Sequence, residues 1–131
     1  MHQQKGFTVI ELTVVIVVAL AVATLFFIQK QGVDMASRDK QRKTSINSLH
    51  YGLEKVFYPQ YHYYPNQLNK ETLAVVEPGL FKDPSGQEIN QPKSNYRYLP
   101  SGCIKDKCKG YTLRTTLEKE ADYIKRSQGG S

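Results

Sequence analysis

The heptapeptide Gly6-Phe7-Thr8-Val9-Ile10-Glu11-Leu12 decides how this chain is organised, because it joins a short polar leader to a long apolar run. The leader is Met1–Lys5, and the apolar run extends from Phe7 to Ile28. About 20 apolar residues are enough for a helix to cross the hydrocarbon core of a membrane. An unpaired carboxylate inside such a span costs roughly 2.5–3.5 kcal/mol on insertion scales. We therefore expect Glu11 to have a specific partner or function.

The residues around this junction resemble the processing and assembly motif of type IV prepilins and pseudopilins. The resemblance is carried by the sequence GFTVIELTVVI, residues 6–16, and extends more weakly through a charged helical stretch to Tyr63-Tyr64-Pro65. It implies that a membrane peptidase cleaves between Gly6 and Phe7 and that the new N-terminus of Phe7 is methylated. The apolar helix would then remain in the mature subunit.

A conventional secretory signal is the alternative interpretation of the same run. Ala19-Leu20-Ala21 and Ala21-Val22-Ala23 both resemble small-x-small cleavage sites. Against this interpretation, the leader is nearly uncharged, Glu11 interrupts the run, and apolar residues continue to Ile28. Only prepilin-type processing gives both Gly6 and Glu11 a role.

The charges that flank the apolar run conflict with the orientation that the resemblance implies. Apart from His2, Lys5 is the sole basic side chain before the run, whereas several follow it: Lys30, Arg38, Lys40, Arg42 and Lys43. The positive-inside rule alone would place the C-terminal part in the cytoplasm. The resemblance implies the opposite, with the leader in the cytoplasm and the head outside. It predicts a precursor in the cytoplasmic membrane and then an extracellular pilus.

Beyond the apolar run we expect the helix to continue, because no proline occurs between Gln29 and Tyr58. An apolar stripe at spacings of three and four indicates one buried helix face, formed by Ile46, Leu49, Leu53 and Val56. Pro59 should end the helix. The run lacks Gly and Pro between Phe7 and Gln31, so the helix should be continuous there. The expected parts are a cleaved leader (1–6), an apolar helix (7–29), its amphipathic continuation (30–58) and a head (59–131).

The head contains β-rich segments separated by turn sequences, which predicts an α+β fold. In that fold a long N-terminal helix packs against a small antiparallel sheet, as in the type IV pilin fold that the resemblance implies. The expected strands are 96–99 and 110–117, which form a hairpin, while 121–126 is either a last strand or a helical turn. We also expect a β-turn at 83–86, a short helix near 70–76 and a frayed end at 129–131.

The two cysteines, Cys103 and Cys108, lie close together in this head and are the only ones in the chain. With no further cysteine and three scattered histidines, a zinc site is poorly supported, and neither a metal nor another cofactor is expected. A local disulfide fits better and implies an oxidising environment around the head. Two free thiols in a cytosolic head remain the alternative.

The resemblance also implies how subunits assemble. The ammonium group of Phe7 and the carboxylate of Glu11 are the expected assembly pair, either between neighbouring subunits or within one chain. A helix that is apolar all round must be buried in lipid or in protein. The expected filament core consists of Val9, Ile10, Leu12, Val14, Val15, Ile16, Val17, Val18, Leu20, Leu25, Phe26 and Phe27.

The chain is basic, with a formal net charge of +6, which makes DNA and anionic host surfaces candidate partners. Lys105, Lys107 and Lys109 alternate near the cysteines and form a candidate ligand-binding rim, although a merely solvated surface is the alternative. The head has no grouping of nucleophile and base, so an enzyme is not expected.

The resulting hypothesis is a structural subunit that polymerises into a type IV pilus (fimbrium) for adhesion, twitching motility or DNA uptake. The resemblance implies identical or related pilin subunits in a helical homopolymer as partners, together with a prepilin peptidase, a membrane platform and an assembly ATPase. A pseudopilin of a type II secretion or competence system is one alternative. A single-span, membrane-anchored adhesion module is another.

Overall fold

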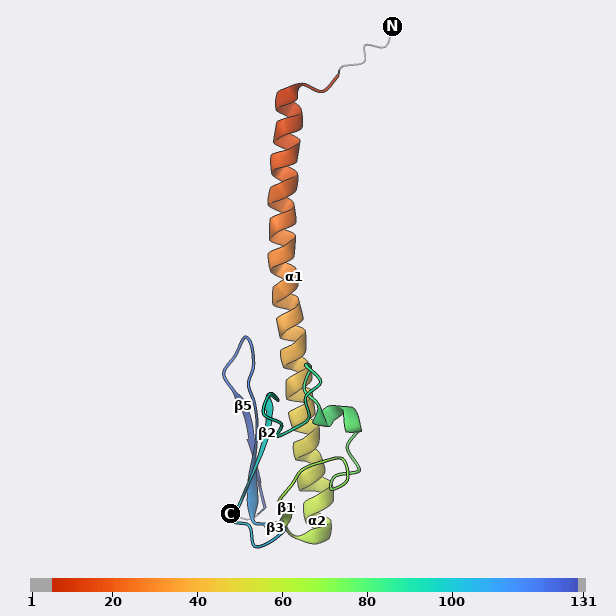
Figure 1. Ribbon diagram of the computed structural model, residues 1–131, viewed down its shortest axis with the longest axis vertical. Coiled ribbons are helices and arrows are strands. Elements are labelled where there is room, and N and C mark those ends of the chain that lie inside the picture. The colour runs from red at the N-terminus through yellow and green to blue at the C-terminus, as the bar shows by residue number, and fades with distance from the viewer. Residues whose placement is uncertain (1–5, 130–131) are drawn as a thin grey trace. The chain divides into compact units, whose positions relative to one another are not determined.

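The structure is a computed structural model that describes residues 6–129, so most of the predicted leader and the last two residues lie outside the described part. The chain divides into two units, residues 1–35 and residues 36–131, which are considered separately below. Helix α1 (Val9–Tyr51) runs through the first unit and into the second (Figure 1). It is followed without a break by the π-helical segment η1 (Gly52–Phe57) and by α2 (Tyr58–Tyr61).

The described part of the first unit is helical from Val9 onward, and the predicted continuity of the helix is confirmed. The threonines inside the apolar run do not leave unpaired hydroxyls. Thr13 donates to the carbonyl of Val9 at 2.7 Å, and Thr24 donates to that of Ala21 at 2.8 Å. Both polar groups are thereby satisfied within the helix and need no partner from outside it.

The prediction that Pro59 ends the helix is wrong, because the helix continues to Tyr61. The chain first changes to the wider i→i+5 hydrogen bonding of η1, and Pro59 then lies in the first turn of α2. Proline is tolerated in the first turn of a helix, where its missing N–H is not needed. The helix ends at His62, which adopts a left-handed conformation (φ 59°) and donates its N–H to the carbonyl of Tyr58 at 2.8 Å.

The second unit contains a three-stranded antiparallel sheet in the order β2-β4-β5 (Figure 1). Its strands are β2 (Tyr96–Ser101), β4 (Gly110–Thr115) and β5 (Tyr123–Arg126). The predicted hairpin is therefore confirmed, and the last segment is a strand rather than a helical turn. A second, two-stranded sheet pairs β1 (Tyr64–Pro65) with β3 (Lys107–Cys108), which the sequence did not predict.

The loop between the helix and the sheet differs from the prediction at one place. Residues 70–75 form turns instead of a short helix, because the side chain of Asn69 accepts the N–H groups of Glu71 and Thr72. The helical turn η2 (Pro78–Phe81) follows later. The predicted β-turn at 83–86 is confirmed, since Gly86 donates its N–H to the carbonyl of Asp83 at 2.9 Å.

The core of the second unit lies between the helix and the inner face of the sheet. Ile46, Leu49 and Leu53 of the predicted stripe are fully buried, but Val56 is 37% exposed because the wider turn of η1 rotates it away. Four fully buried tyrosines complete this core, namely Tyr64, Tyr96, Tyr98 and Tyr111.

Candidate processing and assembly site

The predicted cleavage point lies outside any helix or strand. Gly6, Phe7 and Thr8 precede α1, and the Phe7 side chain is 78% exposed. A Cβ atom added at Gly6 would meet no other atom within 4 Å, so packing in this chain does not require a glycine there. A requirement for a small residue at this position would therefore come from an enzyme that binds the segment.

Thr8 fixes the start of the helix. Its hydroxyl oxygen accepts the N–H of Glu11 at 3.3 Å, and its carbonyl accepts the N–H of Leu12 at 3.0 Å. Thr8 thus caps the helix, and Glu11 occupies the third helical position, where a carboxylate is favoured by the helix dipole. The spacing Thr-x-x-Glu is the sequence signature of a capping box, a signal that the sequence analysis missed.

The carboxylate of Glu11 has no hydrogen-bond or ion-pair partner within residues 6–129. Around it the helix surface is apolar and open, with every large apolar side chain from Val9 to Ile28 exposed. The helix is long and apolar enough to cross a membrane, with a mean hydropathy of 2.7 over its most apolar 18 residues. The predicted filament-core residues therefore form a surface that the chain does not cover with its own described residues.

The disulfide between Cys103 and Cys108 is present and closes a short loop between β2 and β4. The structure does not bring the three predicted lysines together. Lys107 and Lys109 line one hollow of about 350 Å³ beside Tyr58 and Tyr63, whereas Lys105 does not line it. The ammonium of Lys107 lies 5.1 Å from the centre of the Tyr63 ring. Among residues 6–129 no cluster of three or more His, Cys, Asp or Glu side chains could hold a metal.

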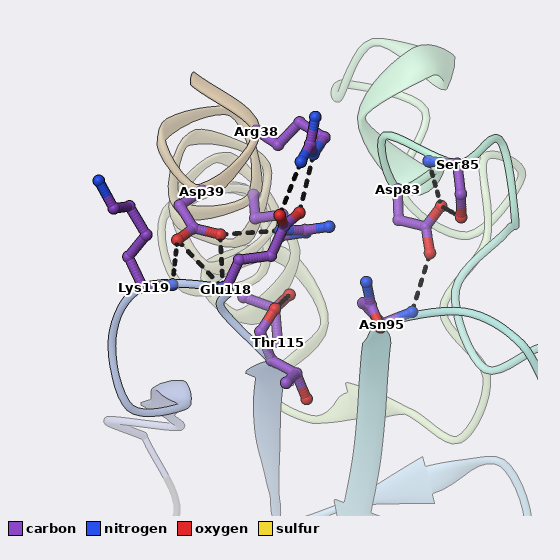
Figure 2. A network of polar contacts seen from close by, with 10 residues as sticks. Arg38, Asp39, Asp83, Ser85, Asn95, Thr115, Glu118 and Lys119 are labelled. Atoms are coloured by element: carbon purple, nitrogen blue, oxygen red, sulfur yellow. Dashed lines mark hydrogen bonds and ion pairs between the residues drawn. The ribbon is translucent and has the colours of Figure 1, made fainter. Parts of the chain in front are cut away.

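A partly buried ion cluster, which was not predicted from the sequence, ties the helix to the segment after β4 (Figure 2). The buried carboxylate of Asp39 accepts the backbone N–H of Glu118 and of Lys119, both at 2.9 Å, and a hydrogen bond from Arg42 at 2.8 Å. Glu118 receives a bidentate pair of hydrogen bonds from Arg38 at 2.7 and 2.8 Å. We name the side chains of Arg38, Asp39, Arg42 and Glu118 the helix clamp.

The clamp lowers the pKa of both carboxyl groups. Burial raises the pKa of Asp39, but the hydrogen bonds from Glu118, Lys119 and Arg42 outweigh burial and hold it below its usual range. Hydrogen bonds from Arg38 and then Arg42 lower the pKa of Glu118 to about 2. Both groups therefore stay ionised well into the acid range.

A second polar cluster holds the C-terminal residues in place. Glu54 of η1 accepts hydrogen bonds from the hydroxyls of Tyr64 and Tyr111 and from the N–H of Gln128. Burial, with the nearby Glu54, raises the pKa of Tyr64 to about 12. Gly129 donates its N–H to the Tyr64 hydroxyl at 3.0 Å, so the prediction that this residue frays is wrong.

Comparison with known families concerns the N-terminal segment that contains Gly6, Phe7 and Glu11. Residues 1–27 match the family model of the prokaryotic N-terminal methylation motif. The segment is a prepilin-type processing motif. It supports a precursor of the pilin or pseudopilin kind and points to a structural subunit. The long helix packed against small antiparallel sheets is an α+β fold consistent with that of type IV pilins. Neither the curated proteins nor the solved structures gave a match.

Proposed function

We propose that this chain is a structural subunit which, after cleavage between Gly6 and Phe7, polymerises into a type IV pilus. One observation carries the proposal. Glu11 lies in the first turn of α1, where the helix is apolar on every side as far as Ile28, and its carboxylate has no partner within residues 6–129. The matched motif, residues 1–27, includes Glu11 and most of the apolar part of this helix.

The apolar helix needs two successive environments. A helix that is apolar all round is stable only in lipid or against other apolar surfaces. Before assembly the membrane provides that environment, with the head outside the cell. After assembly the same helices from neighbouring subunits replace the lipid, and the polar heads coat the filament.

The ion pair proposed for assembly follows from the cap geometry. Cleavage creates an ammonium group on Phe7, immediately before the cap residue Thr8 and close to the positive end of the helix dipole. The Glu11 carboxylate of a neighbouring subunit would neutralise this cation. The pairing would also offset the free-energy cost of burying that carboxylate. Because Glu11 lies in the first turn of α1 and Phe7 lies two residues before that helix, their pairing would also set the axial position of one subunit against the next.

The remaining partners are those that such processing requires. A prepilin peptidase would remove the leader and methylate Phe7, and a membrane platform with its ATPase would extract the subunits. Adhesion, twitching motility and DNA uptake are the cellular roles that a polymer of this kind could serve.

Mass spectrometry of the sheared surface fraction tests the proposal. We expect a chain that starts at methylated Phe7 and contains the Cys103–Cys108 disulfide, as the main component of long fibres. A short polymer confined to the envelope would instead indicate a pseudopilin. A monodisperse membrane protein that retains Met1 would overturn the proposal.

A further inference from the structure

The outer face of the three-stranded sheet carries an unusual pair of like charges. Arg97 of β2 lies directly opposite Arg114 of β4 in the antiparallel register. Like charges directly opposite each other on one sheet face are destabilising. Polar neighbours within the unit offset part of this repulsion, yet two cations stay side by side on an exposed face, which favours a role in binding an acidic surface.

The rest of this face is basic and partly apolar. Arg97 donates to the carbonyl oxygens of Gln91 and Pro92, and Arg114 lies 3.8 Å from the carboxylate of Asp122. The guanidinium of Arg126 makes no hydrogen bond or ion pair with any residue that the structure describes. Two apolar side chains between the arginines are substantially exposed: Leu99 at 49% and Ile124 at 42%. We call these five outward side chains, Arg97, Leu99, Arg114, Ile124 and Arg126, the arginine face.

A second surface of the same unit is lined by two acidic side chains. A groove of about 570 Å³ runs between the helix and the loop after it, where Tyr51 is 63% and Val75 is 59% exposed. A neighbouring hollow of about 220 Å³ shares Val56 and Val75 with it. The charged residues among those lining these two hollows are Glu77 and Glu71. We call the two hollows together the loop groove.

The arginine face and the loop groove are complementary in charge, and both expose apolar side chains. Figure 1 shows strands β2 and β5 on one side of the helix and the helical turn η2, which contributes Leu80 to the groove, on the other. One copy therefore cannot satisfy both surfaces by itself. We propose that the arginine face of one subunit binds the loop groove of a second copy of this chain.

The type of contact fits the proposed function, on which this inference rests. Two different patches that meet between copies make a heterologous contact, which leads to an open helical polymer whenever the rotation does not close. The apolar helices alone could slide against one another, since an all-apolar surface offers little specificity. A charged contact between heads would fix the rotation between neighbours, just as the Glu11 pair fixes their axial position.

Charge reversal with rescue tests the contact. The variants E71R/E77R and R114E/R126E each place like charges across the contact, and we expect each to lower the yield of sheared filaments at least about tenfold. Combining all four changes restores opposite charges and should recover most of the yield. The control E88R reverses an exposed acid that does not line the loop groove, and it should leave the yield unchanged. Equal yields from all variants, or no recovery in the fourfold variant with folded heads, would overturn the inference.

A photo-crosslinking residue in place of Val75 separates this inference from the proposed function. In filaments of the full chain we expect its products to join Val75 to peptides of β2, β4 or β5 of another copy. Filaments that form normally but crosslink elsewhere would remove the head contact and leave the pilus assignment intact. A wild-type chain that never forms filaments would instead remove the proposed function.

Discussion

The two units of this chain are specified in different ways. Residues 9–35 form a helix in which no large apolar side chain is buried by the chain itself, whereas residues 36–131 build their own core around Leu49, Tyr98 and Leu113. The apolar surface of the first unit is thus left uncovered by the residues that the structure describes, whereas the second unit has a core of its own. A substitution should therefore affect assembly in the first unit and folding in the second.

Substitutions of Glu11 should have the strongest effect on assembly and should leave folding unchanged. Glu11→Ala and Glu11→Val should abolish filaments and leave membrane insertion intact, because they remove the only carboxylate near the start of the apolar run. Asp34→Ala, which removes an exposed acid of the same unit, should assemble normally. Electron microscopy of the sheared fraction and membrane fractionation measure the two outcomes. Normal fibres from either Glu11 variant would refute the ion pair.

Within the second unit the helix clamp should give the largest loss of folding stability. Asp39→Ala removes one of the two carboxylates that Arg42 contacts and leaves this buried guanidinium with Glu118 alone. It also removes the acceptor of the backbone N–H groups of Glu118 and Lys119. Removing one partner of a buried ion pair costs about 3–5 kcal/mol. Urea unfolding of the detergent-solubilised chain, followed by near-UV signal from the head tyrosines, would measure it. The exposed Asp106 provides the control, since Asp106→Ala removes only its bond to Asn66.

The clamp also makes the second unit sensitive to acid. The pKa of Glu118 falls from its ordinary value of 4.5 to about 2 on folding, and that of Asp39 is also lowered. The native state binds these protons more weakly than the unfolded state, so the stabilisation is fully present above about pH 4.5 and is lost as the pH falls toward 2. Glu118→Gln should flatten this dependence. An unchanged pH profile in that variant would contradict the assignment.

The disulfide should contribute less than the clamp. It closes a loop with a sequence separation of only 5 residues, and the chain-entropy model gives roughly 2 kcal/mol for so short a loop. We expect the double variant C103S/C108S to remain folded but to melt earlier, measured by the same urea titration. Loss of the fold in this variant would show that the loop organises β3 and β4 more strongly than entropy alone predicts.

The sequence predicted the first unit well because everything that specifies it is local. Helix periodicity, the absence of proline and the motif around Gly6 are all read within a short window. The contacts of the second unit join residues far apart, such as Asp39 and Glu118, and no local pattern announces such a pair. Strands β1 and β3 have only two residues each, which is too short to show the alternation of apolar and polar residues that predicts a strand. Asp39 and Lys43 are four residues apart, the spacing of a helical ion pair, but Lys43 instead pairs with Glu120.

The smallest change in stability is expected at Gly52, where the helix changes to the i→i+5 hydrogen bonding of η1. Gly52 opens η1 and is buried, and an added Cβ atom would lie 2.8 Å from Cγ2 of Val76 and 3.0 Å from Cδ2 of Leu73. Gly52→Ala should therefore destabilise the head by about 1–3 kcal/mol through overpacking and displace the loop that forms the groove. Gly79→Ala is its matched control, because a Cβ atom there meets nothing within 4 Å. Thermal melts measure stability, and the filament yield measures the groove. Both substitutions add one methyl group. Equal melting temperatures would therefore mean that the loop can move away from Gly52 at no cost in stability, and that this contact does not fix the shape of the groove.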